Sequence, residues 1–65
     1  LTAREREMLK GMARGGSNQE IADELFIFRD TVRNHIASIL SKLGATSKLQ
    51  AVTIGIQRGL ITLDR

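Results

Sequence analysis

Three short motifs constrain the fold of this chain more than any other feature. Each has a hydroxyl residue followed three positions later by Glu or Gln, and they begin at Thr2, Ser17 and Ser47. In such a capping box the hydroxyl accepts a hydrogen bond from a helix amide, while the Glu or Gln side chain accepts one from the hydroxyl residue's own amide. The motifs therefore predict three helix starts, each one residue after its hydroxyl.

Apolar spacing and glycines predict where the helices continue and end. Apolar residues recur every three or four positions and there is no proline, which is typical of helices. Gly15, Gly44 and Gly59 can adopt the left-handed conformation that often ends a helix. The chain is thus predicted to be all-α, a four-helix bundle with helices at about 3–14, 18–25, 29–43 and 48–57. After Gly59, the apolar residues Leu60, Ile61 and Leu63 are expected to fold back on the core.

Composition excludes several classes of protein. Hydrophobic residues make up 42% and aromatic residues 3% of the 65 residues, so the core must be small and aliphatic. With no Cys and one His, neither a disulfide nor a structural zinc site is expected. No apolar run approaches the roughly 20 residues that span a bilayer, and no secretory signal opens the chain, so a cytoplasmic setting is expected. We expect no enzyme activity and no cofactor, because no nucleophile and base form a motif and Gly15-Gly16 lacks the P-loop lysine spacing.

The net charge of +3 is unevenly distributed along the chain. Residues 1–25 carry four basic and five acidic side chains, whereas residues 26–58 carry five basic side chains and Asp30 as the one acidic residue. A polyanion would prefer the second half. Taken alone this is weak evidence, because many small basic domains bind nothing anionic.

The second and third predicted helices have the residues that a helix-turn-helix needs. Ala22 supplies the small residue that two steeply crossing helices need, Ile27 fills the turn, and Val32 and Ile36 anchor the next helix. Such a pair can also be plain packing. The segment from about Asn18 to Leu43 therefore predicts a helix-turn-helix without fixing its function.

The third predicted helix carries an unusual polar face. Opposite its apolar stripe lie short polar or small residues: Asp30, Asn34, Ala37, Ser38 and Ser41, with Arg33 and Lys42 at the borders. A merely solvated face would usually carry long Glu and Lys pairs. Short side chains let the helix backbone approach a surface, and Asn and Arg can pair bidentately with adenine and guanine. This face favours insertion into a DNA groove.

The motifs in their order resemble the LuxR-type, or NarL/FixJ-type, helix-turn-helix domain over essentially the whole chain. They are Leu1-Thr2-Ala3-Arg4-Glu5, Gly15-Gly16-Ser17-Asn18-Gln19-Glu20-Ile21-Ala22, Thr31-Val32-Arg33-Asn34-His35, Lys42-Leu43-Gly44, Gln50-Ala51-Val52 and Gly59-Leu60-Ile61. The resemblance implies sequence-specific binding of double-stranded DNA in bacterial transcription regulation, as in response regulators of two-component systems. Residues 1–65 would form one DNA-binding domain, which we expect to be the C-terminal part of a longer regulator because the chain opens without Met, directly on a helix-entry motif.

The resemblance also implies the residues of the site. The helix at residues 29–43 would lie in the major groove, with base edges contacted by Arg33, Asn34 and Ala37. Contacts to the DNA backbone would come from Ser17, Asn18, Gln19, Arg29, Thr31, His35, Ser38, Lys42 and Lys48. A homodimer would form through the fourth helix, at Lys48, Gln50, Ala51, Ile54, Gly55 and Arg58. Its two half-sites would lie about 10–10.5 bp apart, and RNA polymerase is a further candidate partner.

The chain departs from the family pattern at a few positions. Phe28 stands where the family usually has Ser, so the third helix is predicted to lack a side-chain cap. An alternative interpretation of Phe28 is a packing surface for another domain or subunit. Gly11 and Gly55 interrupt helices and are interpreted as tolerated weak points. His35 lies at the border of the apolar stripe, where partial burial and a phosphate contact are both compatible with its position.

Two other functions compete with this interpretation. Region four of a sigma factor shares the helix-turn-helix and also binds RNA polymerase, although the Gly59-Leu60-Ile61 ending and the Ser17-Asn18 entry favour the LuxR type. Alternatively, Phe26, Phe28 and the fourth helix would form an exposed apolar surface of a protein-interaction module.

Overall fold

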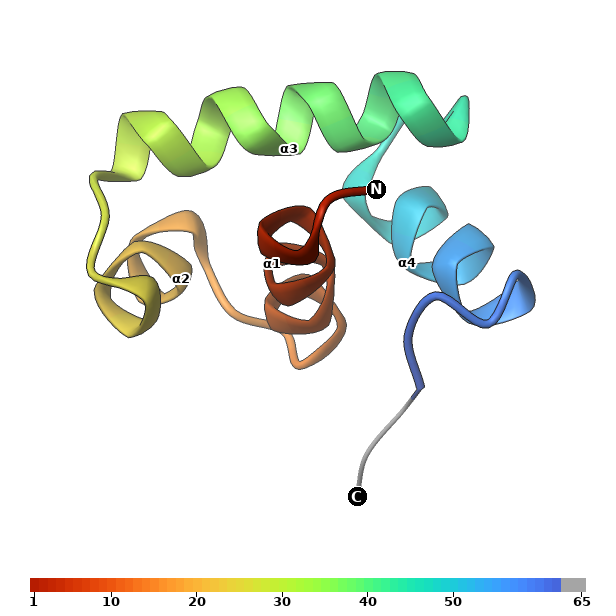
Figure 1. Ribbon diagram of the computed structural model, residues 1–65, viewed down its shortest axis with the longest axis horizontal. Helices are drawn as coiled ribbons and strands as arrows, with labels where there is room; N and C mark the ends of the chain where they lie inside the picture. Colours follow the sequence, from red (N-terminus) through yellow and green to blue (C-terminus); the bar gives the residue numbers. More distant parts are fainter. Residues whose placement is uncertain (63–65) are drawn as a thin grey trace.

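The computed structural model of the chain describes residues 1–62 and consists of four helices, with no strand in that range. They are α1 (Ala3–Ala13), α2 (Asn18–Leu25), α3 (Arg29–Leu43) and α4 (Lys48–Gln57). The all-α prediction is confirmed, and the predicted bounds hold except that α1 ends one residue early, with Arg14 as its C-cap. In Figure 1, α3 lies across the other three helices, with α1 between α2 and α4. No described helix has the length and apolar character to cross a membrane.

Two of the three predicted capping boxes are complete. The Thr2 hydroxyl accepts from the Glu5 amide at 3.1 Å, and the Thr2 amide donates to the Glu5 carboxylate at 2.9 Å. Ser17 and Glu20 repeat this exchange at the start of α2. These local bonds satisfy amides that have no partner within the helix.

Of the two hydrogen bonds predicted for the third capping box, one is confirmed and the other is wrong. The Ser47 hydroxyl does accept from the Gln50 amide, but the Gln50 side chain accepts from the Thr46 amide at 2.6 Å and the Thr46 hydroxyl at 2.9 Å instead. Both donors of Thr46 reach the same Gln50 oxygen, and Ser47 has a more extended backbone (φ −149°) than the other two caps (φ −73°). Gln50 thus ties the preceding loop to α4.

The core is aliphatic, as predicted. Met8 and Leu9 of α1 are fully buried at its centre, and α3 contributes Val32, Ile36, Ile39 and Leu43. Ile61 follows α4 and is buried against this core, while Leu60 is partly buried. The predicted return of the chain after Gly59 is confirmed for these two residues, and Leu63 lies outside the described residues.

Gly11 and Gly55 lie where two helices approach each other, which their interpretation as weak points did not anticipate. A Cβ added at Gly11 would lie 2.9 Å from Ile21 Cγ1, and one added at Gly55 would lie 2.8 Å from Leu9 Cδ2. The two glycines allow α1 to approach α2 and α4 closely. Their place in the core follows from distances between helices, which no local sequence motif contains.

Candidate nucleic-acid interface

The face of α3 opposite the core is exposed. Arg33, Asn34 and Ala37, the three residues predicted to contact bases, all lie on it, and Ser41 extends it one turn further. The alternation of this face with the buried stripe from Val32 to Leu43 follows directly from the helical period. The short side chains at its centre leave the helix backbone accessible.

The first turn of α3 has no side-chain cap, as predicted. Phe28 is the N-cap and makes no cap hydrogen bond. Asp30 and Arg33 are one turn apart, with 4.0 Å between Oδ1 and Nη2, and both side chains are mostly exposed. Arg29 is exposed and has no ion pair among the described residues. The amides of this turn and two guanidinium groups are therefore open to an anion.

A buried carboxylate fixes the position of α3 against α1. Glu5 is 3% exposed and accepts hydrogen bonds from Ser38 Oγ at 3.0 Å and Lys42 Nζ at 2.8 Å, besides its cap bond from Thr2. The hydrogen bonds from Lys42 and from the Thr2 amide lower the pKa of Glu5 from 4.5 to about 2, although burial acts against them. Glu5 therefore stays ionised and holds both partners.

This network concerns two residues predicted to contact phosphate. Ser38 is half-buried with its hydroxyl donated to Glu5, and the Lys42 side chain is 48% exposed with its ammonium partly committed to the same carboxylate. An ammonium has three donors, so Lys42 retains capacity for a phosphate. Sequence reasoning interpreted Glu5, together with Arg4, as structural and did not connect it with these two residues.

The starts of α2 and α4 meet through two other predicted phosphate contacts. Lys48 Nζ donates to Asn18 Oδ1 at 2.6 Å. The neighbouring predicted contacts are engaged within α2, where Ser17 exchanges bonds with Glu20 and Gln19 Nε2 donates to Asp23 Oδ1 at 2.9 Å. The Ser17 bonds lower the pKa of the Glu20 carboxyl. Thr31 and His35 are half-buried on α3.

The predicted dimer surface of α4 needs correction at two positions. Ala51 is fully buried and Gly55 is buried against α1, so neither is available to a second chain. Lys48, Gln50 and Arg58 are exposed, as expected, and Ile54 is half-buried. The apolar residues that α4 does expose are Leu49 and Ile56, at 77% and 37%. Leu49 and Ile56 are two helical turns apart in the sequence. This spacing indicates that they lie on one side of the helix, and sequence reasoning did not use it.

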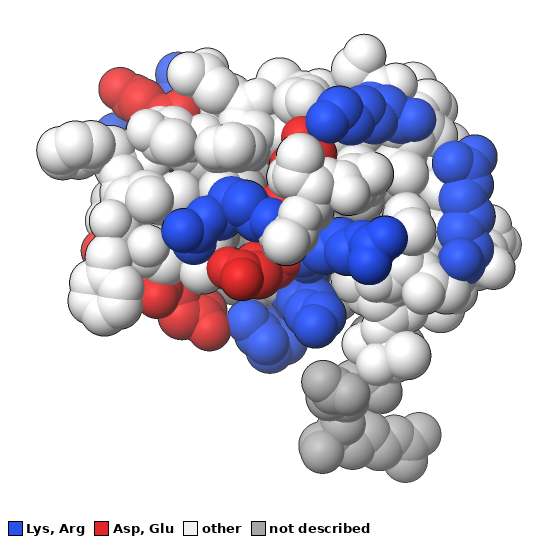
Figure 2. Space-filling model, viewed as in Figure 1, with Lys and Arg blue, Asp and Glu red and all other residues white. Residues whose placement is uncertain are grey.

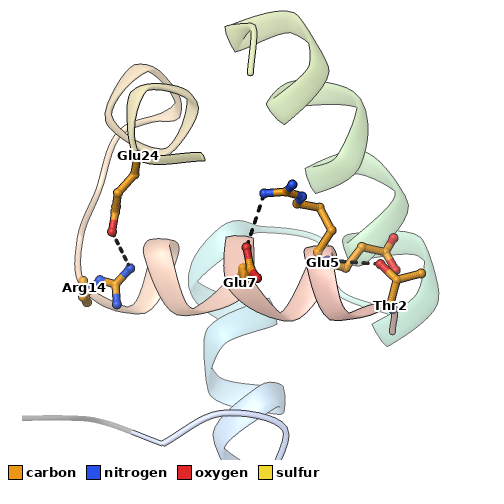
Figure 3. A network of polar contacts seen from close by, with 6 residues as sticks. Thr2, Glu5, Glu7, Arg14 and Glu24 are labelled. Carbon is orange, nitrogen blue, oxygen red and sulfur yellow. Dashed lines mark hydrogen bonds and ion pairs between the residues drawn. The ribbon is translucent and has the colours of Figure 1, made fainter. Parts of the chain in front are cut away.

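Charge is segregated over the surface. In Figure 2 most of the visible acidic side chains gather over α2 and the start of α3, whereas the right-hand side, over α4 and the end of α3, shows Lys and Arg but no Asp or Glu. Figure 3 shows how α1 and α2 are joined away from α3, by the ion pair of Arg14 with Glu24 at 3.1 Å. The basic side is therefore the one that suits a polyanion.

The arrangement of α2 and α3, with Ala22 buried on α2 and an exposed polar face on α3, is that of a helix-turn-helix domain. Comparison with known proteins identifies its family. Residues 1–54 match the family model of the bacterial regulatory proteins of the luxR family. The chain belongs to this luxR family, which decides against a sigma-factor region. The family is a class of DNA-binding transcription regulators.

Several relatives are similar along nearly the whole chain. The spore germination protein GerE of Bacillus subtilis is 43% identical over 63 residues, covering 97% of this chain and 85% of GerE. A solved structure of the transcription factor GerE superposes with a TM-score of 0.94 at 39% identity, covering 98% of this chain and 96% of that one. GerE shows that a protein of nearly this length can consist of this domain.

Other relatives are much longer. The response regulator VraR of Staphylococcus aureus is 48% identical over 61 residues, which are 94% of this chain and 29% of VraR. The response regulator ChrA of a heme-sensing two-component system has a TM-score of 0.91 at 43% identity, covering 94% of this chain and 30% of ChrA. The chain also spans only 30% of the B. subtilis transcriptional regulatory protein YdfI, to which it is 42% identical.

Proposed function

We propose that the chain reads duplex DNA by placing α3 in the major groove, with Arg33, Asn34 and Ala37 against base edges. The observation that carries this proposal is the exposed face of short side chains directly opposite the buried stripe of α3. Arg33 suits guanine and Asn34 suits adenine, while Ala37 can contact a thymine methyl group. The Asp30 carboxylate lies beside Arg33, so it orients the guanidinium or accepts from a cytosine amine.

The DNA backbone is held from both sides of α3. Arg29 and Thr31 in its first turn face one strand, and Lys42 at its end faces the other. The joined starts of α2 and α4, where Asn18 meets Lys48, offer amides and an ammonium to a further phosphate. Ser17, Gln19, His35 and Ser38 complete the predicted set. These contacts fix the register of the helix but carry no sequence preference of their own.

The exposed side of α4 supports a homodimer on paired half-sites. Leu49 and Ile56 are apolar and exposed, and Lys48, Gln50 and Arg58 are exposed on the same helix and at its end. Covering this stripe with the same stripe of a second chain makes a two-fold contact. Ile54 is half-buried on another side of α4.

In the cell, we propose that residues 1–65 act as the C-terminal domain of a longer cytoplasmic regulator. This chain covers only 29–30% of the length of VraR, YdfI and ChrA, which supports a longer protein. RNA polymerase is then the machinery that the DNA-bound regulator would influence. No catalytic step is required for this function.

Selection from a random duplex pool over a salt series tests DNA reading. We expect an enriched sequence and a steep fall in affinity with salt, because phosphate contacts release counterions. Equal affinity for all sequences, or no duplex affinity, would contradict the proposal.

Duplexes with one half-site and with two half-sites about one turn apart then test the dimer. Leu49→Glu should remove the cooperative gain on the paired site and leave single-site binding unchanged.

A further inference from the structure

Two aromatic side chains project from the turn between α2 and α3 without packing against the chain. Phe26 is 95% exposed and Phe28 is 83% exposed, while Ile27 between them is turned toward the core. They are the most exposed large apolar residues among residues 1–62. Two large apolar side chains exposed on one short turn offer apolar surface of the kind that often marks an interaction site.

Both residues stand where another residue would serve folding better. Phe26 adopts a left-handed backbone (φ 58°, ψ 43°), the one non-glycine residue to do so in the described range, and Gly would fit that conformation without strain. Phe28 is the N-cap of α3, where Ser or Asp would supply the missing cap bond. Folding does not explain either aromatic residue, and a strained or unfavourable choice that persists points to function.

The surroundings of the pair are acidic. A hollow of about 480 Å³ beside Phe28 is lined by Gln19, Asp23, Ile27, Phe28, Arg29 and Asp30. The adjacent α2 carries Glu20, Asp23 and Glu24 and no basic residue. Exposed carboxylates repel the phosphates of DNA, whereas they attract Lys and Arg side chains, which can also stack on an aromatic ring.

We propose that Phe26, Phe28 and Asp23 form a docking surface for a protein segment that combines Lys or Arg with aliphatic residues. The aliphatic side chains cover the two rings, and a cationic end reaches the Asp23 carboxylate in the hollow. The surface lies at the turn between α2 and α3 and includes none of the residues that we place against bases, so the segment binds while DNA is bound. This inference goes beyond DNA reading and does not depend on it.

A display selection of random 12-residue peptides against the chain tests this surface. We expect enrichment of peptides with Lys or Arg among Leu, Ile or Val, and a fluorescence anisotropy titration of the best synthetic peptide gives its Kd. The double variant Phe26→Gly, Phe28→Ser should weaken that peptide at least tenfold. Both substitutions suit the backbone better than phenylalanine, so unfolding does not account for a loss, and circular dichroism checks this.

Four further measurements keep the outcome decisive. Leu49→Ser removes an exposed apolar residue elsewhere and should leave peptide binding unchanged, whereas Asp23→Asn should weaken it severalfold. The single variant Phe26→Gly should retain its affinity for the selected duplex, and saturating duplex should not displace the peptide. No enrichment, enrichment of acidic or uncharged peptides, insensitivity to the double variant, or displacement by DNA would each overturn the proposal. Failure of DNA binding alone would overturn only the proposed function.

Discussion

The Lys42 ammonium donates to the Glu5 carboxylate across 2.8 Å, which joins the end of α3 to the start of α1. Because Glu5 is buried and also receives the Ser38 hydroxyl, one carboxylate fixes both the depth and the rotation of α3. The helix that we propose enters the groove is thus positioned by a residue that touches no DNA.

Glu5 should make the domain sensitive to acid. Its pKa is about 2 in the folded chain against 4.5 normally, so its stabilisation is fully present above about pH 4.5 and is lost as the pH falls toward 2. Glu5→Gln should lower the free energy of unfolding at pH 7 by about 1–3 kcal/mol and flatten its decline below pH 4.5. Urea unfolding at several pH values measures this. Glu7→Gln, an exposed partner of Arg4, is the matched control and should change little.

Phe26→Gly should stabilise the fold. The side chain is 95% exposed and loses little packing, while relief of the left-handed backbone should yield about 0.5–1 kcal/mol. Thermal unfolding monitored by circular dichroism measures the gain. Phe26→Ala keeps the strain and serves as the control; equal effects of Gly and Ala would show that the backbone conformation is not the cause.

Phe28→Ser should also stabilise the chain, through the N-cap of α3. A hydroxyl there can accept from the free amides of the first turn, which is worth about 0.5–2 kcal/mol. Leu49→Ser removes a similarly exposed residue from the first turn of α4, where Ser47 already caps the helix. Chemical unfolding should show a gain for the first variant and none for the second.

Gly55→Ala should destabilise the chain although alanine is the better helix former. The added methyl would lie 2.8 Å from Leu9 Cδ2 in a filled core, and such overpacking typically costs about 1–3 kcal/mol, more than the roughly 0.5–1 kcal/mol gained from helix propensity. Thr53→Ala, on the exposed side of the same helix, should be neutral or stabilising. A stabilised Gly55→Ala variant would show that Leu9 can move aside.

Local motifs made most of the fold predictable from sequence. Thr2 and Ser17 begin their helices through bonds that span three residues, and Gly44 ends α3 in a left-handed conformation (φ 67°). The exposed position of Arg33 and Asn34 likewise follows from the helical period.

What could not be predicted depends on distances between helices. Nothing near Glu5 in the sequence indicates that it reaches Lys42, 37 residues away. In the same way, Gly55 fits a dimer surface by its small size, yet that size serves the contact with Leu9 of α1 inside one chain. The left-handed Phe26 gave no signal, because glycine is the residue expected in that conformation.

The most direct test of α3 as the reading element compares Arg33→Ala with Arg29→Ala on the selected duplex and on its single-base variants, by fluorescence anisotropy. Arg33→Ala should relax the preference at one base position per half-site, at a cost of about 1–3 kcal/mol. Arg29→Ala should weaken all sequences alike and reduce the salt dependence. Loss of preference at the same position in both variants, or in neither, would contradict the placement of the Arg33 face in the major groove.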